Sequence, residues 1–399
     1  MIDVERPRDS TDPLRWDPLL PLDDPYPTYR RLRDEAPLFH DPDLGVWAFS
    51  RFDDVKAAAE DWATYSSAGE RGNDHDDTYL LFKPAGDLPA ADPPLHTRLR
   101  GALRLAFSPS RINAQFEPVV RAKVRRLIDA FADRGRADLA SEFARPLPGG
   151  MICTWLGFPE EDHPLLLGWF ARMLDRTPGE TSLPATALEA RAQMGVYLQD
   201  AAKARRVAPR DDLLSFLVAA QAAGSLTEDE IIGGSVLLFF AGITTTSGLL
   251  SNSLYHLAAF PDQRDLLRAE PGRMPAAIEE LLRFDAPIQA LGRVATRDVE
   301  AYGMTIPAGS HVSLVWASAN RDERRWPDPD RLDIGRQPQR HVAFGEGIHH
   351  CLGAPLARLE ARVAFEELLR RIPAYTVAGP VTRISTPTDR ALESLPVEF

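Results

Sequence analysis

Apolar and polar positions follow two different patterns along this chain. Between Leu95 and Leu282 the apolar residues recur mostly at helical spacing, and the stretch from Asp211 to Ala223 has the pattern of one amphipathic helix. Strand-like runs dominate from Val294 to Trp316, and a second β-rich region is expected after Ile372. The pattern therefore predicts a mainly α protein with a smaller β portion, an α+β fold.

A long uncharged helix is the strongest single element in this pattern. Thr227 and Glu230 form a capping-box sequence that marks its start, and no Asp, Glu, Lys or Arg occurs from Ile231 to Pro261. The stretch is long enough to span a bilayer, but its many Thr and Ser residues and its acidic flanks are not typical of a membrane helix. We therefore expect it to be the central helix of a large core, without membrane contact.

Composition and charge restrict the class of function. The chain has 399 residues and a net charge of −12 at pH 7, which disfavours nucleic acid as a partner. Only two cysteines occur, which argues against a disulfide framework and for a reducing compartment. Cys153 lies in an apolar run and is expected to be a core thiol. The first residues are charged rather than apolar, so we expect a cytoplasmic protein.

The second cysteine, Cys351, lies at the end of a glycine-rich loop and directly before a helical pattern. The positive end of a helix dipole favours a thiolate, which is a good ligand for iron, although a free cysteine more often packs as a small hydrophobe. The stretch from Phe344 to Gly353 resembles the heme-ligand loop of the cytochrome P450 family, Phe-Gly-x-Gly-x-His-x-Cys-x-Gly. The resemblance implies that Cys351 binds heme iron and that Phe344, Gly345 and Gly353 line the heme pocket.

A second resemblance falls on the long helix. Ala241 and Gly242 would leave room beside it for a flat ligand, although small residues equally suit helix packing. The run Ala-Gly-Ile-Thr-Thr that they begin resembles the oxygen-binding groove of the same family, and Thr245 matches the threonine that positions dioxygen. The family usually has a carboxylate, which helps to relay protons, where this chain has Thr244. Proton delivery must therefore use water, another side chain or a slower route.

Basic residues follow two adjacent prolines near the start of the helical region. His96 and Arg100 share a helix face and could bind one anionic group, although a solvated helix start would have the same sequence. By the resemblance they contact the heme propionates, together with Arg293 and His349.

A charged pair precedes the β-rich region. Glu280 and Arg283 can pair on one helix face, as many surface pairs do, and they resemble the family's Glu-x-x-Arg motif. Arg331 matches the arginine that completes a buried network with this pair. We expect the three residues to stabilise the scaffold near the heme.

The resemblance also indicates a substrate pocket. It implies an apolar pocket lined by Phe240, Ala241, Gln289, Leu291 and Leu392, with the loop from Ser66 to Asp92 and a lid near Trp169 and Phe170. The bulk of Phe240 favours a modest, aromatic substrate.

The resemblance covers essentially the whole chain and implies one domain over residues 1–399, with a long central helix over the heme and the cysteine loop. It implies a monooxygenase that inserts one oxygen atom from O2 into a C–H bond of a small apolar substrate, by hydroxylation or O-demethylation. The cofactor would be heme b, and electrons would come from NAD(P)H through a ferredoxin reductase and a ferredoxin. Basic residues near the matched elements suggest a docking patch for such an acidic donor: Arg98, Arg104, Arg121, Lys123, Arg125, Arg126, Arg358 and Arg362.

Three alternatives stay open. With Thr244 in place of a carboxylate, the enzyme could use peroxide or perform oxidative coupling. The protein could also bind heme without catalysis and sense or store a small ligand. A metal-free hydrolase that uses Cys351 is the third alternative.

Overall fold

Helices make up most of the protein, as the sequence pattern predicts. The computed structural model describes residues 14–17, 23–68, 86–175, 183–337, 339–384 and 388–399. Its α-helices are α1 (Tyr26–Glu35), α2 (Phe52–Glu60), α3 (Leu95–Leu103), α4 (Pro109–Asp129), α5 (Pro146–Leu156), α6 (His163–Met173), α7 (Ala185–Val207), α8 (Leu213–Ala222), α9 (Glu228–Ala259), α10 (Pro261–Ala269), α11 (Met274–Phe284), α12 (Trp316–Ala319) and α13 (Ala354–Arg371).

The β portion is smaller and lies in several short sheets. The largest has five strands in the order β1-β2-β8-β5-β3, in which only β2 and β8 pair in parallel. The strands are β1 (Leu38–Asp41), β2 (Val46–Phe49), β3 (Tyr65–Ser66), β4 (Arg136–Asp138), β5 (Leu291–Ala295), β6 (Val299–Ala301), β7 (Met304–Ile306), β8 (His311–Leu314), β9 (Thr376–Val377), β10 (Thr382–Arg383), β11 (Leu392–Ser394) and β12 (Pro396–Glu398). The predicted mainly α class with a smaller β portion is confirmed.

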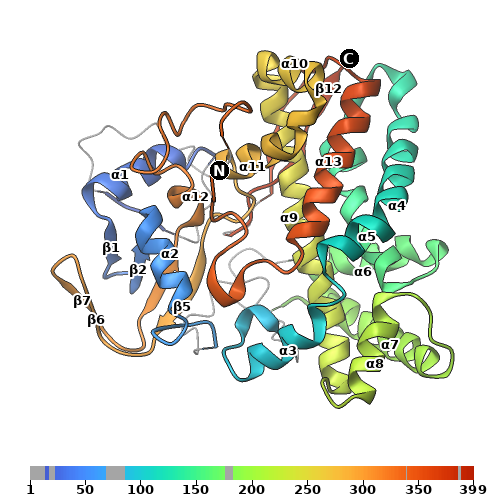
Figure 1. The fold of residues 1–399 in the computed structure, drawn as a ribbon, viewed down its shortest axis with the longest axis horizontal. Coiled ribbons are helices and arrows are strands. Elements are labelled where there is room, and N and C mark those ends of the chain that lie inside the picture. The colour runs from blue at the N-terminus through green and yellow to red at the C-terminus, as the bar shows by residue number, and fades with distance from the viewer. Residues whose placement is uncertain (1–13, 18–22, 69–85, 176–182, 338, 385–387) are drawn as a thin grey trace.

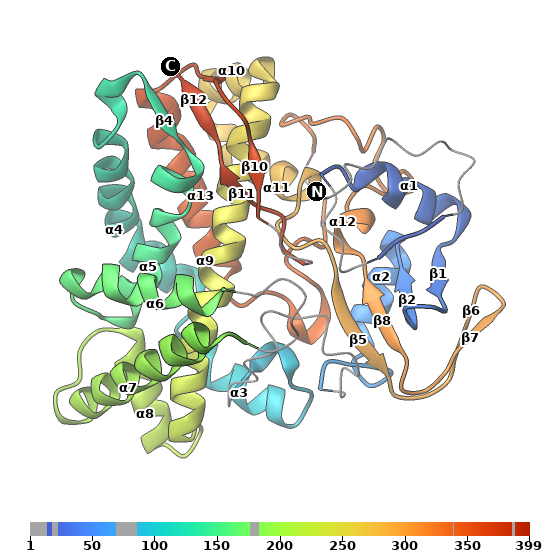
Figure 2. The same cartoon turned by 180° about the vertical axis from the view of Figure 1, so that it is seen from behind.

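Most of the helices gather on one side of the molecule, and the five-stranded sheet lies on the other side together with α1, α2 and α12 (Figure 1). From behind, α9 runs through the helical side next to α13, while β5 and β8 lie on the other side (Figure 2). The largest apolar cluster draws on α4, α5, α9 and α13, and a second cluster covers the five-stranded sheet. The long helix and the helix that follows Cys351 therefore share one core.

The start and the burial of α9 follow from its sequence. The Thr227 hydroxyl accepts a hydrogen bond from the Glu230 N–H at 3.2 Å, and the Glu230 carboxylate accepts one from the Thr227 N–H at 2.8 Å. By length and composition α9 could cross a membrane, but 61% of its most apolar stretch is buried inside the protein. That burial is what the prediction of a central core helix requires.

An ion pair fixes α3 against the start of α9. The Arg98 guanidinium donates to both carboxylate oxygens of Glu230, at 2.8 and 2.6 Å, and also to the Ser225 carbonyl at 2.9 Å. The hydrogen bonds from Arg98 lower the pKa of Glu230 to about 2. Because α3 also carries His96 and Arg100, this contact helps to place both side chains.

Candidate active site

The loop that carries Cys351 is held by tight turns and by close packing. The Cys351 N–H donates to the Phe344 carbonyl at 2.8 Å, which closes the loop. Gly345 and Gly347 adopt φ values of +69° and +66°, which residues other than glycine rarely adopt. A Cβ on Gly347 would lie 2.6 Å from the Ala59 carbonyl oxygen, so the loop also packs tightly against the end of α2.

The surroundings of the Cys351 sulfur fit a thiolate ligand. Burial raises the pKa of the Cys351 thiol, while the N–H groups of Gly353 and Ala354 and the charges of Arg100 and Arg358 lower it. The N–H groups at the start of α13 therefore lower the pKa of Cys351 as predicted, but without heme the rise caused by burial is larger. The residue as a whole is only partly buried.

The predicted propionate-binding residues of α3 lie against the cysteine loop. The His96 and His349 rings are 4.6 Å apart, and the Arg100 guanidinium donates to the His350 carbonyl at 2.8 Å. The His96 side chain is buried, and within the described part of the chain its Nε2 has no hydrogen-bond partner. Burial and the charge of Arg100 lower the pKa of His96, whereas a hydrogen bond with the Ile348 backbone raises it, and an anionic partner at Nε2 would favour the protonated ring, in which both nitrogens donate. An orphaned donor beside an arginine fits a carboxylate of a bound cofactor.

Arg293 lies on β5 and is 5% exposed. Its guanidinium donates to the Gly292 carbonyl at 2.7 Å. Its predicted role with the propionates stays a prediction.

The middle of α9 exposes one small residue between buried neighbours. Ala241 is exposed, whereas Phe240 and Ile243 are buried. The Thr245 hydroxyl donates to the Ala241 carbonyl at 2.7 Å, and the Thr244 hydroxyl donates to the Phe240 carbonyl at 3.1 Å. The face of α9 with exposed Ala241 and half-buried Thr245 is therefore where the helix could meet a flat cofactor.

Gly242 has a different role from the one expected. A Cβ on Gly242 would lie 2.5 Å from Cδ1 and 2.9 Å from Cγ1 of Ile152 on α5. The expectation that Gly242 leaves room for a flat ligand is wrong, because Ile152 fills the space where its side chain would be. The glycine permits close packing of α5 and α9.

The predicted Glu280–Arg283 network exists, but its third member is wrong. The Arg283 guanidinium donates to both oxygens of Glu280, at 2.7 and 2.9 Å, and both side chains are buried. The second arginine is Arg336, whose Nε donates to Glu280 Oε1 at 3.2 Å. Arg331 contributes its backbone carbonyl to both arginines, and its side chain is exposed. The loop between these arginines is irregular, so sequence spacing alone did not distinguish them.

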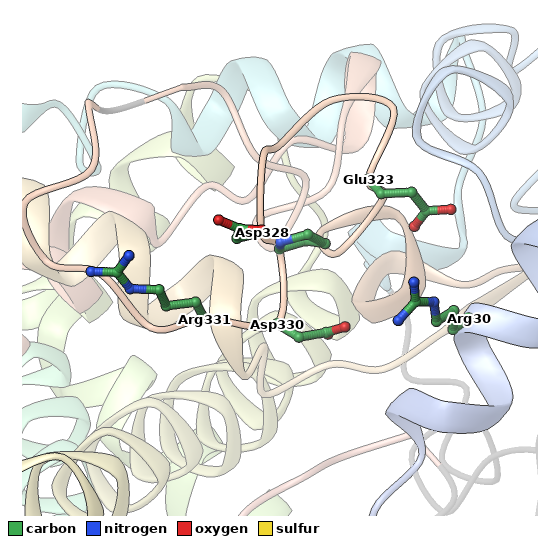
Figure 3. Close-up of a pocket in the computed structure, with 6 residues that line it drawn as sticks. Arg30, Glu323, Asp328, Asp330 and Arg331 are labelled. Carbon is green, nitrogen blue, oxygen red and sulfur yellow. The ribbon is translucent and has the colours of Figure 1, made fainter.

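The exposed side chain of Arg331 lines a pocket of about 340 Å³ (Figure 3). Charged residues dominate this pocket: Arg30, Glu323, Asp328, Asp330 and Arg331, with Pro329. Residues predicted to touch heme or substrate do not line it. We therefore do not treat it as the active site.

The predicted substrate residues divide into two groups. Phe240 packs edge to face on Phe170 of α6 with ring centroids 5.2 Å apart, Leu392 is buried on β11, and Leu291 is 36% exposed on β5. Gln289 is buried, and its side-chain amide donates to the Ala286 carbonyl at 2.7 Å and accepts from the Tyr29 hydroxyl at 3.2 Å. Its place in the substrate pocket stays a prediction. Most of the Ser66–Asp92 loop, residues 69–85, lies outside the described residues.

The predicted basic patch is largely neutralised by glutamates. Arg121 and Arg362 bind Glu117 and Glu366, and Arg125 binds Glu367. Other members are paired as well: Arg98 with Glu230, Arg126 with Glu160, and Arg358 with Glu279. Most of these arginines are therefore ion-paired within the protein, and their docking of an acidic electron donor stays a prediction.

Known proteins share this fold over most of their length. A model of the cytochrome P450 family matches residues 193–374. Cytochrome P450 130 of Mycobacterium tuberculosis is 37% identical over 369 residues, which cover 89% of both chains. The vitamin D(3) 25-hydroxylase of Pseudonocardia autotrophica is 37% identical over 365 residues, 89% of this chain and 88% of that one. The crystal structure of CYP109E1 from Bacillus megaterium in complex with testosterone matches with a TM-score of 0.84 and 32% identity, and covers 94% of this chain and 97% of that one.

The fold and the cysteine loop together define the heme-thiolate oxygenase class. The chain belongs to the cytochrome P450 family and is a cytochrome P450 monooxygenase. The family uses heme b, dioxygen and electrons from redox partners, and the donors around Cys351 and His96 fit that cofactor.

Proposed function

We propose that this protein inserts one oxygen atom from O2 into a C–H bond of a small apolar organic substrate, by hydroxylation or O-demethylation. The observation that supports the proposal is the face of α9 at exposed Ala241 and half-buried Thr245, next to buried Phe240 and Ile243. Phe240 and Phe170 would supply an aromatic wall beside that face, and Leu291 and Leu392 would add aliphatic surface. Such a lining favours a substrate with few polar groups.

The residues of the site would divide the work of holding the cofactor. Cys351 would bind the heme iron as thiolate, and His96, Arg100, Arg293 and His349 would bind the propionates. When bound, heme supplies the redox chemistry that activates dioxygen. Thr245 would orient oxygen with its hydroxyl, and the apolar wall would exclude water from the substrate.

A ferredoxin with its reductase is the electron donor that we propose, and the cytoplasm is the proposed location. Because most arginines of the basic patch are paired with glutamates, ferredoxin would not meet a uniformly positive surface. Arg125 and Arg126 are still 56% and 61% exposed, so they can contact an acidic partner at the rim of an interface. Charge reversal at Arg125 should slow reduction by ferredoxin and leave reduction by dithionite unchanged. Equal rates of reduction by ferredoxin in this variant and the wild type would contradict docking at Arg125.

Substrate screening tests the proposal directly. Vitamin D3 and testosterone are suitable first compounds, since a similar hydroxylase is named for the former and a similar protein binds the latter. Compounds that shift the heme absorption band would then be incubated with NADPH, a plant-type ferredoxin and its reductase. A hydroxylated or O-demethylated product is the expected result. Product from peroxide alone would favour the peroxide-using alternative, and ligand binding without product would favour a sensor.

A further inference from the structure

A carboxylate near the C-terminus lies against α9 beside Thr244. Asp389 belongs to an extended segment that pairs with residue Ile288 in an antiparallel bridge. The Arg390 N–H donates to the Pro287 carbonyl at 2.6 Å, and the Gln289 N–H donates to the Thr388 carbonyl at 2.9 Å. These bonds fix the backbone of Asp389 on one side.

Helix α9 fixes the same segment on its other side. The Asn252 side chain donates to the Arg390 carbonyl at 2.8 Å, and the Leu392 N–H donates to the Ser251 hydroxyl at 3.1 Å. A Cβ on Gly248 would lie 3.0 Å from the Arg390 carbonyl oxygen, so the glycine permits this close approach. Gly248 lies one helical turn after Thr244.

Neighbouring side chains of the segment point in opposite directions, as extended backbone requires. The Arg390 guanidinium donates to Asp285 at 2.9 Å and to the Asp23 carbonyl at 2.8 Å. The Asp389 carboxyl instead lies near the Thr244 hydroxyl, which lowers the pKa of Asp389 through hydrogen bonding. The chain therefore places a carboxyl group beside the position where the sequence lacks one.

The Thr244 hydroxyl can adopt two hydrogen-bonded arrangements. It has one proton, and it lies near two acceptors, the Phe240 carbonyl at 3.1 Å and the Asp389 carboxylate. When Asp389 is ionised, the hydroxyl can donate to it. When Asp389 is protonated, the carboxyl can donate to Thr244 while Thr244 donates to Phe240. A rotation of one hydroxyl thus accompanies each change of protonation.

The surroundings of Asp389 contain few charges. Helix α9 has no Asp, Glu, Lys or Arg from Ile231 to Ala259. The ionisable residues in this stretch are Tyr255 and His256, and His256 is bound to Asp285 at 2.8 Å. Residues 286–290 are uncharged, and Arg390 is bound to Asp285. Although part of the side chain is exposed, burial raises the pKa of Asp389 to about 6, and the hydrogen bond from Thr244 lowers it. An acid of this strength can both hold and release a proton near neutral pH.

We propose that Asp389 and Thr244 form the proton-delivering pair of this oxygenase, with Asp389 as the acid and the Thr244 hydroxyl as the group that passes the proton toward Thr245. This inference rests on the proposed function. Monooxygenation consumes O2, two electrons from the redox partner and two protons. The substrate C–H bond breaks, C–O and O–H bonds form, and the second oxygen atom leaves as water with the two protons. Asp389 gives up a proton in each turnover and regains one from solvent.

The first test measures the acid itself and needs no turnover. Infrared spectra of the heme-bound protein should contain a protonated-carboxyl band that disappears with a midpoint near pH 6. The band should be absent from Asp389→Asn and present in Glu393→Gln, a control at an exposed carboxylate on the neighbouring strand β11. Glu360, whose pKa burial raises to about 8, should contribute a separate band to all three proteins. An unchanged band near pH 6 in Asp389→Asn would overturn the inference.

The second test follows oxygen reduction without an organic substrate. NADPH, a plant-type ferredoxin and its reductase supply electrons, and the peroxide released per O2 consumed is measured. Because a positioned acid is needed to form water, Asp389→Asn and Thr244→Val should release several-fold more peroxide per O2, and water formation should slow by about 10-fold or more. In the wild type, the share reduced to water should fall as pH rises through about 6, whereas in Asp389→Asn it should not change over that range.

A rescue variant separates proton delivery from structure. Thr244→Asp in the Asp389→Asn background returns a carboxylate to the helix, and it should restore water formation. If Asp389→Asn released as little peroxide per O2 as the wild type, the role of Asp389 would be overturned, whether or not Thr244→Val had an effect. A wild-type protein that consumes no O2 with electrons supplied would instead contradict the proposed function, and the infrared result would still be informative about the acid.

Discussion

Replacing Arg336 and Arg331 separately by alanine distinguishes the network in the structure from the one expected from the sequence. Arg336 is 14% exposed, and its guanidinium binds Glu280 at 3.2 Å and the carbonyls of Pro327 and Asp328 at 2.8 and 3.2 Å. Arg331 offers only its backbone to this network, and alanine keeps that backbone carbonyl.

The two losses differ in size. A hydrogen bond to a charged group contributes about 1.5–3 kcal/mol, and Arg336→Ala leaves Glu280 with the two bonds from Arg283 and one from the Asp333 N–H. We therefore expect Arg336→Ala to lower the free energy of unfolding by about 2–4 kcal/mol. Arg331→Ala changes an exposed side chain and should cost within about 0.5 kcal/mol.

Thermal unfolding of the two variants at equal heme occupancy, followed by circular dichroism, measures the difference. The unfolding temperature of Arg336→Ala should be clearly lower than that of the wild type, and the unfolding temperature of Arg331→Ala should equal that of the wild type. A larger loss in Arg331→Ala, or equal losses in both, would refute the assignment of Arg336 to the network.

Three further predictions follow from individual contacts. Gly242→Ala should destabilise the protein by about 1–3 kcal/mol through its clash with Ile152, and the cost should shrink in an Ile152→Val background; strict additivity of the two changes in unfolding experiments would contradict the packing. The pKa of Glu230 is about 2 in the folded state, below its unfolded value, so its contribution is full above about pH 4.3 and is lost as pH falls toward 2. Since Arg98 is 40% exposed, this contribution to the free energy of unfolding should be about 1 kcal/mol. Arg98→Ala should remove this part of the pH dependence of unfolding, and an unchanged pH profile in that variant would contradict the pairing. His96→Ala should weaken heme binding by about 10-fold in a heme-transfer assay, whereas His40→Ala, at an exposed position on β1, should not; equal retention in both would exclude His96 as a propionate ligand.

Local sequence signals predicted the elements that depend on neighbouring residues. The capping box and the uncharged run gave the start and the burial of α9, and the glycines and cysteine gave the loop before α13. Helical spacing put His96 and Arg100 on one face, and both side chains contact the cysteine loop, while their role with the propionates stays a prediction. Whether residues 1–399 form a single domain stays a prediction.

Contacts between distant segments were beyond the reach of these signals. Gly242 looks like a ligand-facing residue until Ile152 of α5 is seen to fill its space. Gln289 looks available until Tyr29 binds its side chain. Asp389 gave no signal at all, because only the folded chain brings it to Thr244.

Charge in the sequence was misleading for a related reason. The arginines of α4 and α13 look like one basic patch in the sequence, but both helices also carry glutamates that pair with them. Pairing across two packed helices depends on their relative rotation, which composition does not contain.

The absorption spectrum of the reduced protein under carbon monoxide tests sulfur ligation by Cys351 most directly. The purified, heme-loaded protein should show the red-shifted band of thiolate-bound heme, and Cys351→Ser should lose that band while circular dichroism shows an intact fold. A wild-type spectrum without the red-shifted band would contradict the assignment of Cys351 as the iron ligand and, with it, the proposed oxygenase chemistry.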